Sequence, residues 1–237
     1  MKTSIDAIEW HQRIGDRFSD RYLRSGAFRE RLHVWARLVE AHVTAGAAVL
    51  DAGCGPGVLS CVAARRCAQV EALDASSNMI VLARRRALED GIENIAFHYG
   101  AIGDGALLAG RRFDTILCSS VLEYMDDLDG ALAWLVERLA SEGVLLVSMP
   151  NGRSCYRWAE RATFHVTGAP RYLAYVRHFP SVAQFRERLR RHGLEPRETA
   201  FYAAPAWLRL VAPRSGWSER VEPLFIIAAR RAASRRA

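Results

Sequence analysis

Along most of the chain, short runs of apolar residues alternate with longer stretches in which apolar residues recur every three or four positions. The short runs predict β-strands at about residues 47–51, 70–74, 95–99, 113–118, 143–149, 194–203 and 223–229. The longer stretches have the spacing of one face of an α-helix that packs on a core. This alternation predicts an α/β fold, in which helices cover a largely parallel sheet through right-handed crossovers.

The predicted helices have marked ends. Ser76 is a suitable N-cap for the helix after the second strand, and Gly91 ends that unit. The last helix is predicted to begin at 180–181 and to stop at Gly193. Before the first strand, one helix carries four large apolar residues on a single face: Phe28, Leu32, Trp35 and Val39. Residues 152–180 have an irregular pattern that is rich in arginine and aromatic residues.

The first strand runs directly into a glycine-rich loop, Val-Leu-Asp-Ala-Gly-Cys-Gly-Pro-Gly, over residues 49–57. Glycine lets the backbone turn sharply and lets a ligand approach it closely. The loop differs from the dinucleotide fingerprint G-x-G-x-x-G, because Val58 stands at the third glycine position. Asp51, just before the loop, would repel a pyrophosphate and attract an ammonium or sulfonium group. The loop therefore favours a cationic nucleotide-like cofactor over a nicotinamide dinucleotide.

The second strand ends in Asp74, where a carboxylate can accept hydrogen bonds from both hydroxyls of a ribose. Ser76 and Met79 follow it and give the motif D-x-S-x-x-M at the start of the next helix. Together, V-L-D-x-G-C-G-x-G and D-x-S-x-x-M resemble the motifs of class I S-adenosylmethionine (SAM)-dependent methyltransferases, in the branch that modifies small molecules. The resemblance spans roughly residues 47–150.

The resemblance implies a three-layer, doubly wound sheet of about seven strands, mostly parallel with the last strand antiparallel. It also implies that residues 1–45 form a helical lid and that residues 46–237 form the SAM-binding domain. In such sheets, ligands bind at the carboxyl ends of the strands. The segment 152–180 follows the fifth strand, so we expect it to cover the acceptor pocket as an insertion.

By the same resemblance, SAM is the expected cofactor. The residues expected to bind it are Tyr22, Asp51, Gly53, Gly55, Asp74, Ala75, Met79, Ala101, Ile102, Cys118 and Ser119. Family members usually have an aspartate just after Gly100, where it contacts the adenine amino group. This chain has Ala101 at that position, so we expect the contact from backbone groups or from Asp104.

Methyl transfer from SAM is an in-line displacement, in which the protein mainly aligns and desolvates the two reactants. A hydroxyl acceptor also benefits from a proton acceptor within hydrogen-bond reach. His178, at the end of the segment 152–180, is the expected general base, and Tyr124 is a further catalytic candidate. Glu123 and His165 are weaker candidates, and a mechanism without a base stays open.

We expect methylation of a small molecule at oxygen, in cofactor or natural-product biosynthesis. The aromatic residues of 152–180 favour a flat or lipophilic acceptor. Four arginines are candidates to bind an acidic group on it: Arg157, Arg161, Arg171 and Arg177. An amine acceptor would be served by nearly the same residues. The Asn/Asp-Pro-Pro-aromatic motif of nucleobase amino-methyltransferases does not follow the fourth strand, which counts against base methylation.

Composition and charge leave two other functions open. The chain has 237 residues, half of them hydrophobic, and is long enough for one domain with a large core. The net charge of +7 raises the possibility of an RNA or protein methyltransferase, although arginines spread along helices are typical of a solvated surface. A non-catalytic SAM-binding module is the other alternative, against which the intact glycines and both aspartates count.

The remaining features concern the state of the cysteines, the localisation of the protein and its partners. The five cysteines form no CxxC pair, which indicates reduced thiols and no metal site. The sequence shows no signal-peptide pattern and no run of about 18 apolar residues. We therefore expect a cytoplasmic protein without a membrane span or nucleic-acid partner, as a monomer or homodimer.

Overall fold

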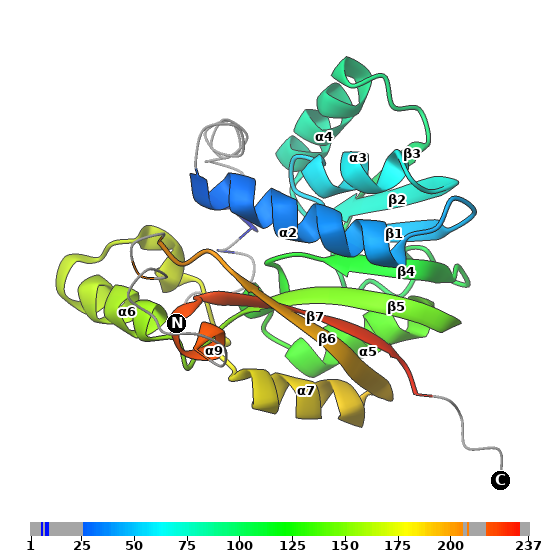
Figure 1. Cartoon of the computed structure of the whole chain (residues 1–237). Helices are drawn as coiled ribbons and strands as arrows, with labels where there is room; N and C mark the ends of the chain where they lie inside the picture. The colour runs from blue at the N-terminus through cyan, green and yellow to red at the C-terminus, as the bar shows by residue number, and fades with distance from the viewer. Residues whose placement is uncertain (1–5, 7, 10–25, 206–207, 209–216, 233–237) are drawn as a thin grey trace, which may run out of the picture.

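The computed structural model describes residues 6, 8–9, 26–205, 208 and 217–232, and these form one seven-stranded sheet with helices on both faces (Figure 1). The strand order is β3-β2-β1-β4-β5-β7-β6. The strands are β1 (Ala48–Ala52), β2 (Gln69–Asp74), β3 (Ile95–Tyr99), β4 (Phe113–Cys118), β5 (Leu139–Pro150), β6 (Leu194–Tyr202) and β7 (Leu224–Arg231). Strand β7 is antiparallel to both of its neighbours, and the other pairs are parallel. The predicted α/β doubly wound sheet with an antiparallel last strand is confirmed.

Helices on the two faces of this sheet complete a three-layer arrangement. They are α2 (Gly26–His42), α3 (Val58–Ala64), α4 (Ser77–Glu89), α5 (Leu128–Arg138), α6 (Cys155–Thr167), α7 (Val182–Arg191) and α9 (Ser218–Val221), with 3₁₀ turns η1 (Leu122–Tyr124) and η2 (Arg171–Ala174). Helices α2 and α3 share one apolar core cluster, and α5 and α7 share the other. Figure 1 shows these two pairs on opposite sides of the sheet.

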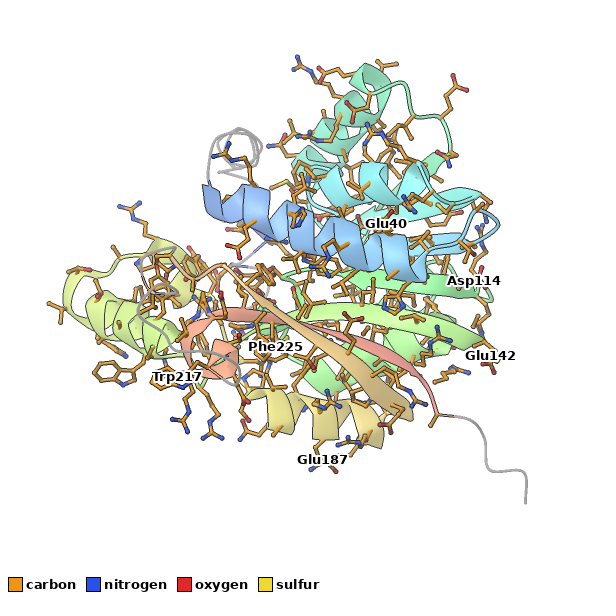
Figure 2. All side chains as sticks on the ribbon, in the orientation of Figure 1. Glu40, Asp114, Glu142, Glu187, Trp217 and Phe225 are labelled. Carbon is orange, nitrogen blue, oxygen red and sulfur yellow. The ribbon has the colours of Figure 1, made fainter. Side chains whose placement is uncertain are left out.

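Alternation along the strands builds the two cores. In β1, Val49 faces the cluster that contains α2 and α3, whereas Leu50 faces the cluster that contains α5 and α7. Figure 2 shows Phe225 of β7 near the middle of the molecule, where its ring packs 5.9 Å from that of Phe185. Three labelled carboxylates lie at the edge of the same view, Asp114, Glu142 and Glu187, whereas Glu40 lies on α2 in front of the sheet. Burial of each large apolar side chain contributes about 1.5–3 kcal/mol.

The predicted helix starts at Ser76 and Ser181 are confirmed. The Ser76 hydroxyl accepts a hydrogen bond from the Met79 N–H at 3.3 Å. Ser181 forms a capping box with Gln184, since each side chain accepts a hydrogen bond from the backbone N–H of the other residue. Caps of this kind contribute about 1 kcal/mol each.

Strand β5 begins four residues earlier than the sequence pattern predicts. It follows α5 without a loop, because Leu139 already has extended backbone angles, and an irregularity in the pairing with β4 absorbs the extra residues. Leu139 is buried in the core, and its apolar character fits both the end of a helix seam and the start of a strand. Local pattern alone does not separate these two states.

The segment 152–180, irregular in sequence pattern, contains the regular helix α6. The Ser154 hydroxyl caps its first turn, and Gly168, with a φ of +68°, ends it. Arg157 is the only buried residue in this helix. Because no apolar seam faces a core, the helical period was invisible in the sequence. Figure 1 shows α6 beyond the end of the sheet.

The described part of the predicted lid, residues 26–42, is helix α2. Trp35 and Val39 are fully buried in the core, and Leu32 packs against them, as the predicted apolar face requires. Phe28, at the start of the same face, lines a cavity instead. This helix is therefore a layer of the domain, and the lid role of residues 1–45 stays a prediction.

Candidate active site

The glycine loop, residues 53–57, crosses the carboxyl end of β1 and is attached to the neighbouring strand. The N–H groups of Gly53 and Cys54 both donate to the Leu73 carbonyl oxygen, at 2.8 and 2.9 Å. Gly53 has a φ of +79°, and a Cβ atom there would lie 2.2 Å from a methyl group of Val121. Gly55 has a φ of +53° but no atom within 4 Å of a Cβ position, so it borders open space. The loop thus has a backbone surface on which a ligand can rest.

Asp74 holds this loop from the end of β2. One carboxylate oxygen accepts a hydrogen bond from the Gly55 N–H, and the other accepts one from the Ser76 N–H, both at 2.8 Å. Burial raises the pKa of this carboxyl, and the two N–H donors oppose the shift. A carboxylate has about four acceptor positions, so the Asp74 side chain can still accept hydrogen bonds from hydroxyls in the cavity.

Asp51 lines the same cavity and is 1% exposed. Its carboxylate accepts a hydrogen bond from the Ser60 hydroxyl at 2.6 Å. Burial raises the pKa of Asp51 to about 6, the Ser60 hydrogen bond opposes that shift, and the negative charge of Asp74 adds to it. Two neighbouring buried carboxylates create a site that favours a cation.

A cavity of about 430 Å³ opens at the carboxyl ends of the parallel strands, within the range expected for small-molecule sites. The cavity lies where the strand order reverses between β1 and β4, which is the usual ligand position in doubly wound sheets. Most of the predicted site residues line it: Asp51, Gly53, Gly55, Asp74, Ala75, Met79, Ala101, Ile102, Ser119 and Tyr124.

Two predicted site residues do not line this cavity. Cys118 is fully buried in the core cluster below it, where burial raises the pKa of its thiol well above the ordinary value. The His178 ring donates a hydrogen bond from Nε2 to the Met125 carbonyl oxygen at 2.9 Å. Its position among residues 152–180 suggested a base, but that hydrogen bond directs the ring to backbone. Tyr22 lies outside the described residues.

Asp104, the predicted alternative contact for adenine, does not line the cavity either. Its carboxylate accepts a hydrogen bond from the Ala106 N–H, and its carbonyl oxygen accepts one from the Trp134 indole. The backbone at Ala101 and Ile102 borders the cavity instead. Of the two predicted alternatives, the structure therefore places only the backbone next to the cavity.

Arg138, which the sequence pattern did not single out, fixes the loop that carries those backbone groups. Its side chain is 2% exposed and donates to the carbonyl oxygens of Leu107 at 2.9 Å and Gly105 at 3.1 Å. The guanidinium also stacks 3.8 Å from the centre of the Trp134 ring. An arginine at the end of an otherwise apolar helix face was the only signal for this role in the sequence.

A second group of lining residues comes from η1, α6 and η2, and we call it the acceptor wall: Glu123, Tyr124, Arg157 and Tyr172. Arg157 is buried and donates to the Glu160 carboxylate at 2.7 Å, to the Tyr172 hydroxyl and to the Pro223 carbonyl oxygen at 3.1 Å. Burial raises the pKa of both tyrosines well above the ordinary value, so their hydroxyls stay protonated.

Three of the four arginines predicted to bind an acidic group have partners within the protein. Arg157 is paired with Glu160, and Arg177 lies 2.9 Å from the Asp126 carboxylate. The Arg161 guanidinium lies 4.8 Å from the centre of the Phe179 ring. Arg31 of α2 lines the cavity and donates to the Ser119 hydroxyl at 2.7 Å, although the sequence pattern gave no indication of it.

Comparison with known proteins agrees with this geometry. A family model described as a methyltransferase domain matches residues 43–196. The chain belongs to this family. The match confirms, for family and fold, the class I methyltransferase expected from the glycine loop and the D-x-S-x-x-M motif. It covers every strand up to β5, the whole of α7 and the first residues of β6.

The methyltransferase domain has relatives with named activities. It is 36% identical over 107 residues to a ubiquinone biosynthesis O-methyltransferase of Xanthomonas euvesicatoria pv. vesicatoria (strain 85-10), covering 45% of this chain and 44% of that protein. The chain thus spans about half the length of the curated relatives it matches.

Solved structures extend the likeness to nearly the whole chain. Magnesium protoporphyrin IX methyltransferase (ChlM) from Synechocystis PCC 6803, with bound SAH, is 20% identical with a TM-score of 0.73, covering 95% of this chain and 98% of that one. The [4+2]-cyclase SpnF is 18% identical with a TM-score of 0.74, covering 98% and 97%. At such identities the likeness shows the fold alone.

Three further observations concern metals, membranes and cysteines. Within the described residues, no group of three or more His, Cys, Asp or Glu side chains is placed to hold a metal ion. None of the helices in the described ranges has the length and apolar character needed to cross a bilayer. The cysteines are free thiols, of which four are buried and Cys155 is exposed.

Proposed function

We propose that this methyltransferase domain transfers a methyl group from SAM to an oxygen of a small-molecule acceptor, in cofactor or natural-product biosynthesis. The observation that carries the proposal is one continuous cavity. The glycine loop, Asp74 and Asp51 border one half of it, and the acceptor wall borders the other. The name of the curated relative, an O-methyltransferase of ubiquinone biosynthesis, supports oxygen as the methylated atom.

The residues present on the cofactor side fit SAM. Asp74 keeps free acceptor positions for the ribose hydroxyls, and Asp51 supplies negative charge close to an ammonium or sulfonium group. The open space beside Gly55 lets the methionine part approach the backbone. Met79 and Ile102 supply apolar surface for the adenine. When bound, SAM supplies an electrophilic methyl carbon next to a positive sulfur.

The acceptor wall supports a small acceptor with a polar group. Tyr124 and Tyr172 are protonated donors that can orient an oxygen or nitrogen atom, and Arg157 fixes Tyr172 through its hydroxyl. Tyr124 is accordingly proposed to position the acceptor. The segment 152–180 contributes Arg157, Tyr172 and Val176 to the cavity, which supports its proposed role as a cover.

An RNA-directed activity is the second candidate because of the net charge of +7. Several surface arginines, however, are paired with carboxylates. Arg65 lies 2.9 Å from the Asp90 carboxylate, and Arg85 lies 2.8 Å from that of Glu89. Paired cations contribute less to a phosphate-binding surface, so the charge supports this candidate only weakly.

The test is an assay with SAM labelled on the methyl group and two sets of small acceptors, catechols and primary aromatic amines. Transfer of label to the catechols, with formation of SAH, is the expected result. Transfer to amines alone would move the assignment to N-methylation. Tight binding of SAH by calorimetry without turnover on either set would contradict transfer to small acceptors of these types and would favour a SAM-binding module.

A further inference from the structure

Glu123 is a buried acidic residue of the acceptor wall. It lies in the turn η1, just beyond the carboxyl end of β4, and is 3% exposed. Within the described residues, its Oε2 atom accepts no hydrogen bond. A buried polar atom without a partner destabilises a folded protein and usually has a functional reason. Glu123 is also one of the residues that line the cavity.

The backbone holds this carboxylate in place. The Glu123 carbonyl oxygen accepts hydrogen bonds from the N–H groups of Arg177 at 2.8 Å and His178 at 3.4 Å. Ser120, just before the turn, has a φ of +57°, which is rare for a residue with a side chain, and its N–H donates to the Ser148 hydroxyl at 2.9 Å. Backbone strain of this kind concentrates at functional sites. The turn is thus fixed on both sides of Glu123.

We propose that Glu123 is the general base, which takes the proton from the acceptor hydroxyl as the methyl group is transferred. This inference rests on the proposed O-methylation. The acceptor oxygen forms its bond to the methyl carbon, the carbon–sulfur bond breaks and its electron pair returns to sulfur, which becomes a neutral thioether. The hydroxyl proton passes to the carboxylate of Glu123 and later leaves to water.

The charges around Glu123 suit a base that works near neutral pH. Burial raises the pKa of Glu123 to about 7. A backbone hydrogen bond, the charges of Arg31 and Arg157 and a hydrogen bond from Ser120 oppose the shift. The other ionisable groups facing it are the Tyr124 phenol and the Cys118 thiol, and burial raises the pKa of both well above their ordinary values. Both therefore stay protonated, and among these groups only the carboxylate can accept a proton near pH 7.

The position of Glu123 also explains why His178 is not needed as a base. Both residues lie at the turn η1, but the His178 Nε2 atom donates to the Met125 carbonyl oxygen. Glu123 lines the cavity, and within the described part of the chain one of its carboxylate oxygens has no hydrogen-bond partner. His178 instead braces the turn that carries the base.

The test compares Glu123→Gln with the wild type on two acceptors, catechol and 4-nitrocatechol, at about pH 8. The nitro compound is already largely ionised at this pH and needs no base, whereas catechol is mainly protonated. We expect the variant to lose a factor of about 10² to 10⁴ in methylation of catechol but less than about tenfold with 4-nitrocatechol. SAH affinity measured by calorimetry should stay within about threefold of the wild type, which shows an intact cofactor site.

A matched control is Glu187→Gln, which removes an exposed carboxylate on α7 and should leave both reactions unchanged. Equal losses on both acceptors, or no loss on either, would overturn the base role. A selective loss in His178→Gln would do the same. If the wild type methylates neither acceptor, the proposed O-methylation of catechols fails by itself. The base role is then judged by an infrared titration of the SAH complex, in which the Glu123→Gln change must abolish a carboxyl band that titrates near neutral pH.

Discussion

The two halves of the cavity are built in different ways. On the cofactor side, the glycine loop and Asp74 come from consecutive strand ends and are joined through backbone hydrogen bonds. On the acceptor side, the wall combines Glu123 of η1 with Arg157 of α6 and Tyr172 of η2, and Arg157 also reaches the Pro223 carbonyl oxygen. Backbone geometry shapes the first half, whereas side chains from distant segments shape the second. A local motif can therefore encode the cofactor half but not the acceptor wall.

The largest expected effect is a loss of stability when a residue of the glycine loop is changed. Gly53→Ala places a Cβ atom 2.2 Å from the Val121 side chain at a φ of +79°, so both a clash and backbone strain must be absorbed. We expect a loss of about 3–4 kcal/mol in the free energy of unfolding, measured by urea denaturation. Gly55→Ala is the matched control: it has the positive φ but no clash, and should lose only about 1 kcal/mol. Equal losses in the two variants would contradict the close contact with Val121.

A somewhat smaller effect on the free energy of unfolding is expected at Glu123, and it depends on pH. Its pKa is about 7 in the folded protein, above the ordinary value of 4.5, so the folded state binds this proton more tightly than the unfolded chain does. The resulting stabilisation is present in full below the ordinary pKa and is lost as pH rises through about 7. The glutamine side chain does not titrate, so Glu123→Gln lacks this pH-dependent stabilisation. The stability of Glu123→Gln relative to the wild type should therefore rise by about 2.5 kcal/mol between about pH 5 and pH 8.

Denaturation curves of both proteins across this pH range, without ligand, provide the measurement. A difference that does not change with pH would mean that the carboxyl titrates near its ordinary value. Asp129→Asn serves as the opposite case, because a hydrogen bond from His192 lowers the pKa of Asp129. Its titration lies below pH 5 in both the folded and the unfolded state, so we expect the stability difference between Asp129→Asn and the wild type to stay nearly constant across this range.

The next effect is on the cofactor side and concerns affinity. Asp74→Ala removes the acceptor for two ribose hydroxyls, and we expect SAH affinity to fall by about 30- to 100-fold in calorimetry. The same change leaves the N–H groups of Gly55 and Ser76 without their acceptor, so the loop should also lose some stability. Asp74→Asn keeps one acceptor oxygen, so its SAH affinity should lie between those of the wild type and of Asp74→Ala. Unchanged affinity in the alanine variant would refute the ribose role.

The sequence predicted the sheet, its antiparallel last strand and most of the cofactor side, because each depends on local pattern. The Asp51 and Asp74 positions follow directly from strand ends, and the glycines follow from the backbone angles they permit. The acceptor wall was harder to predict. Arg31 looks like a surface arginine on a helix until the fold turns it toward the cavity, and Arg157, expected to bind an acidic group of the acceptor, is paired with Glu160.

His178 shows the limit of such reasoning most clearly. Its position along the chain was correct for a residue near the acceptor, since its backbone donates to the Glu123 carbonyl oxygen. The direction of its ring depends on the Met125 carbonyl, which belongs to a turn more than one element away in sequence. Segment position was thus predictable, whereas side-chain orientation required the tertiary structure.

The smallest expected effect separates the two halves. Tyr172→Phe removes the hydroxyl that joins Arg157 to Glu160, at a cost of about 1 kcal/mol in the free energy of unfolding. Since Tyr172 belongs to the acceptor wall alone, the KM for a catechol substrate should rise while SAH affinity stays constant. Tyr175→Phe, a neighbouring phenol outside the cavity lining, is the control. A parallel loss of SAH affinity in Tyr172→Phe would show that the two halves are coupled, because a change confined to side chains of the wall would then reach the backbone-built cofactor site.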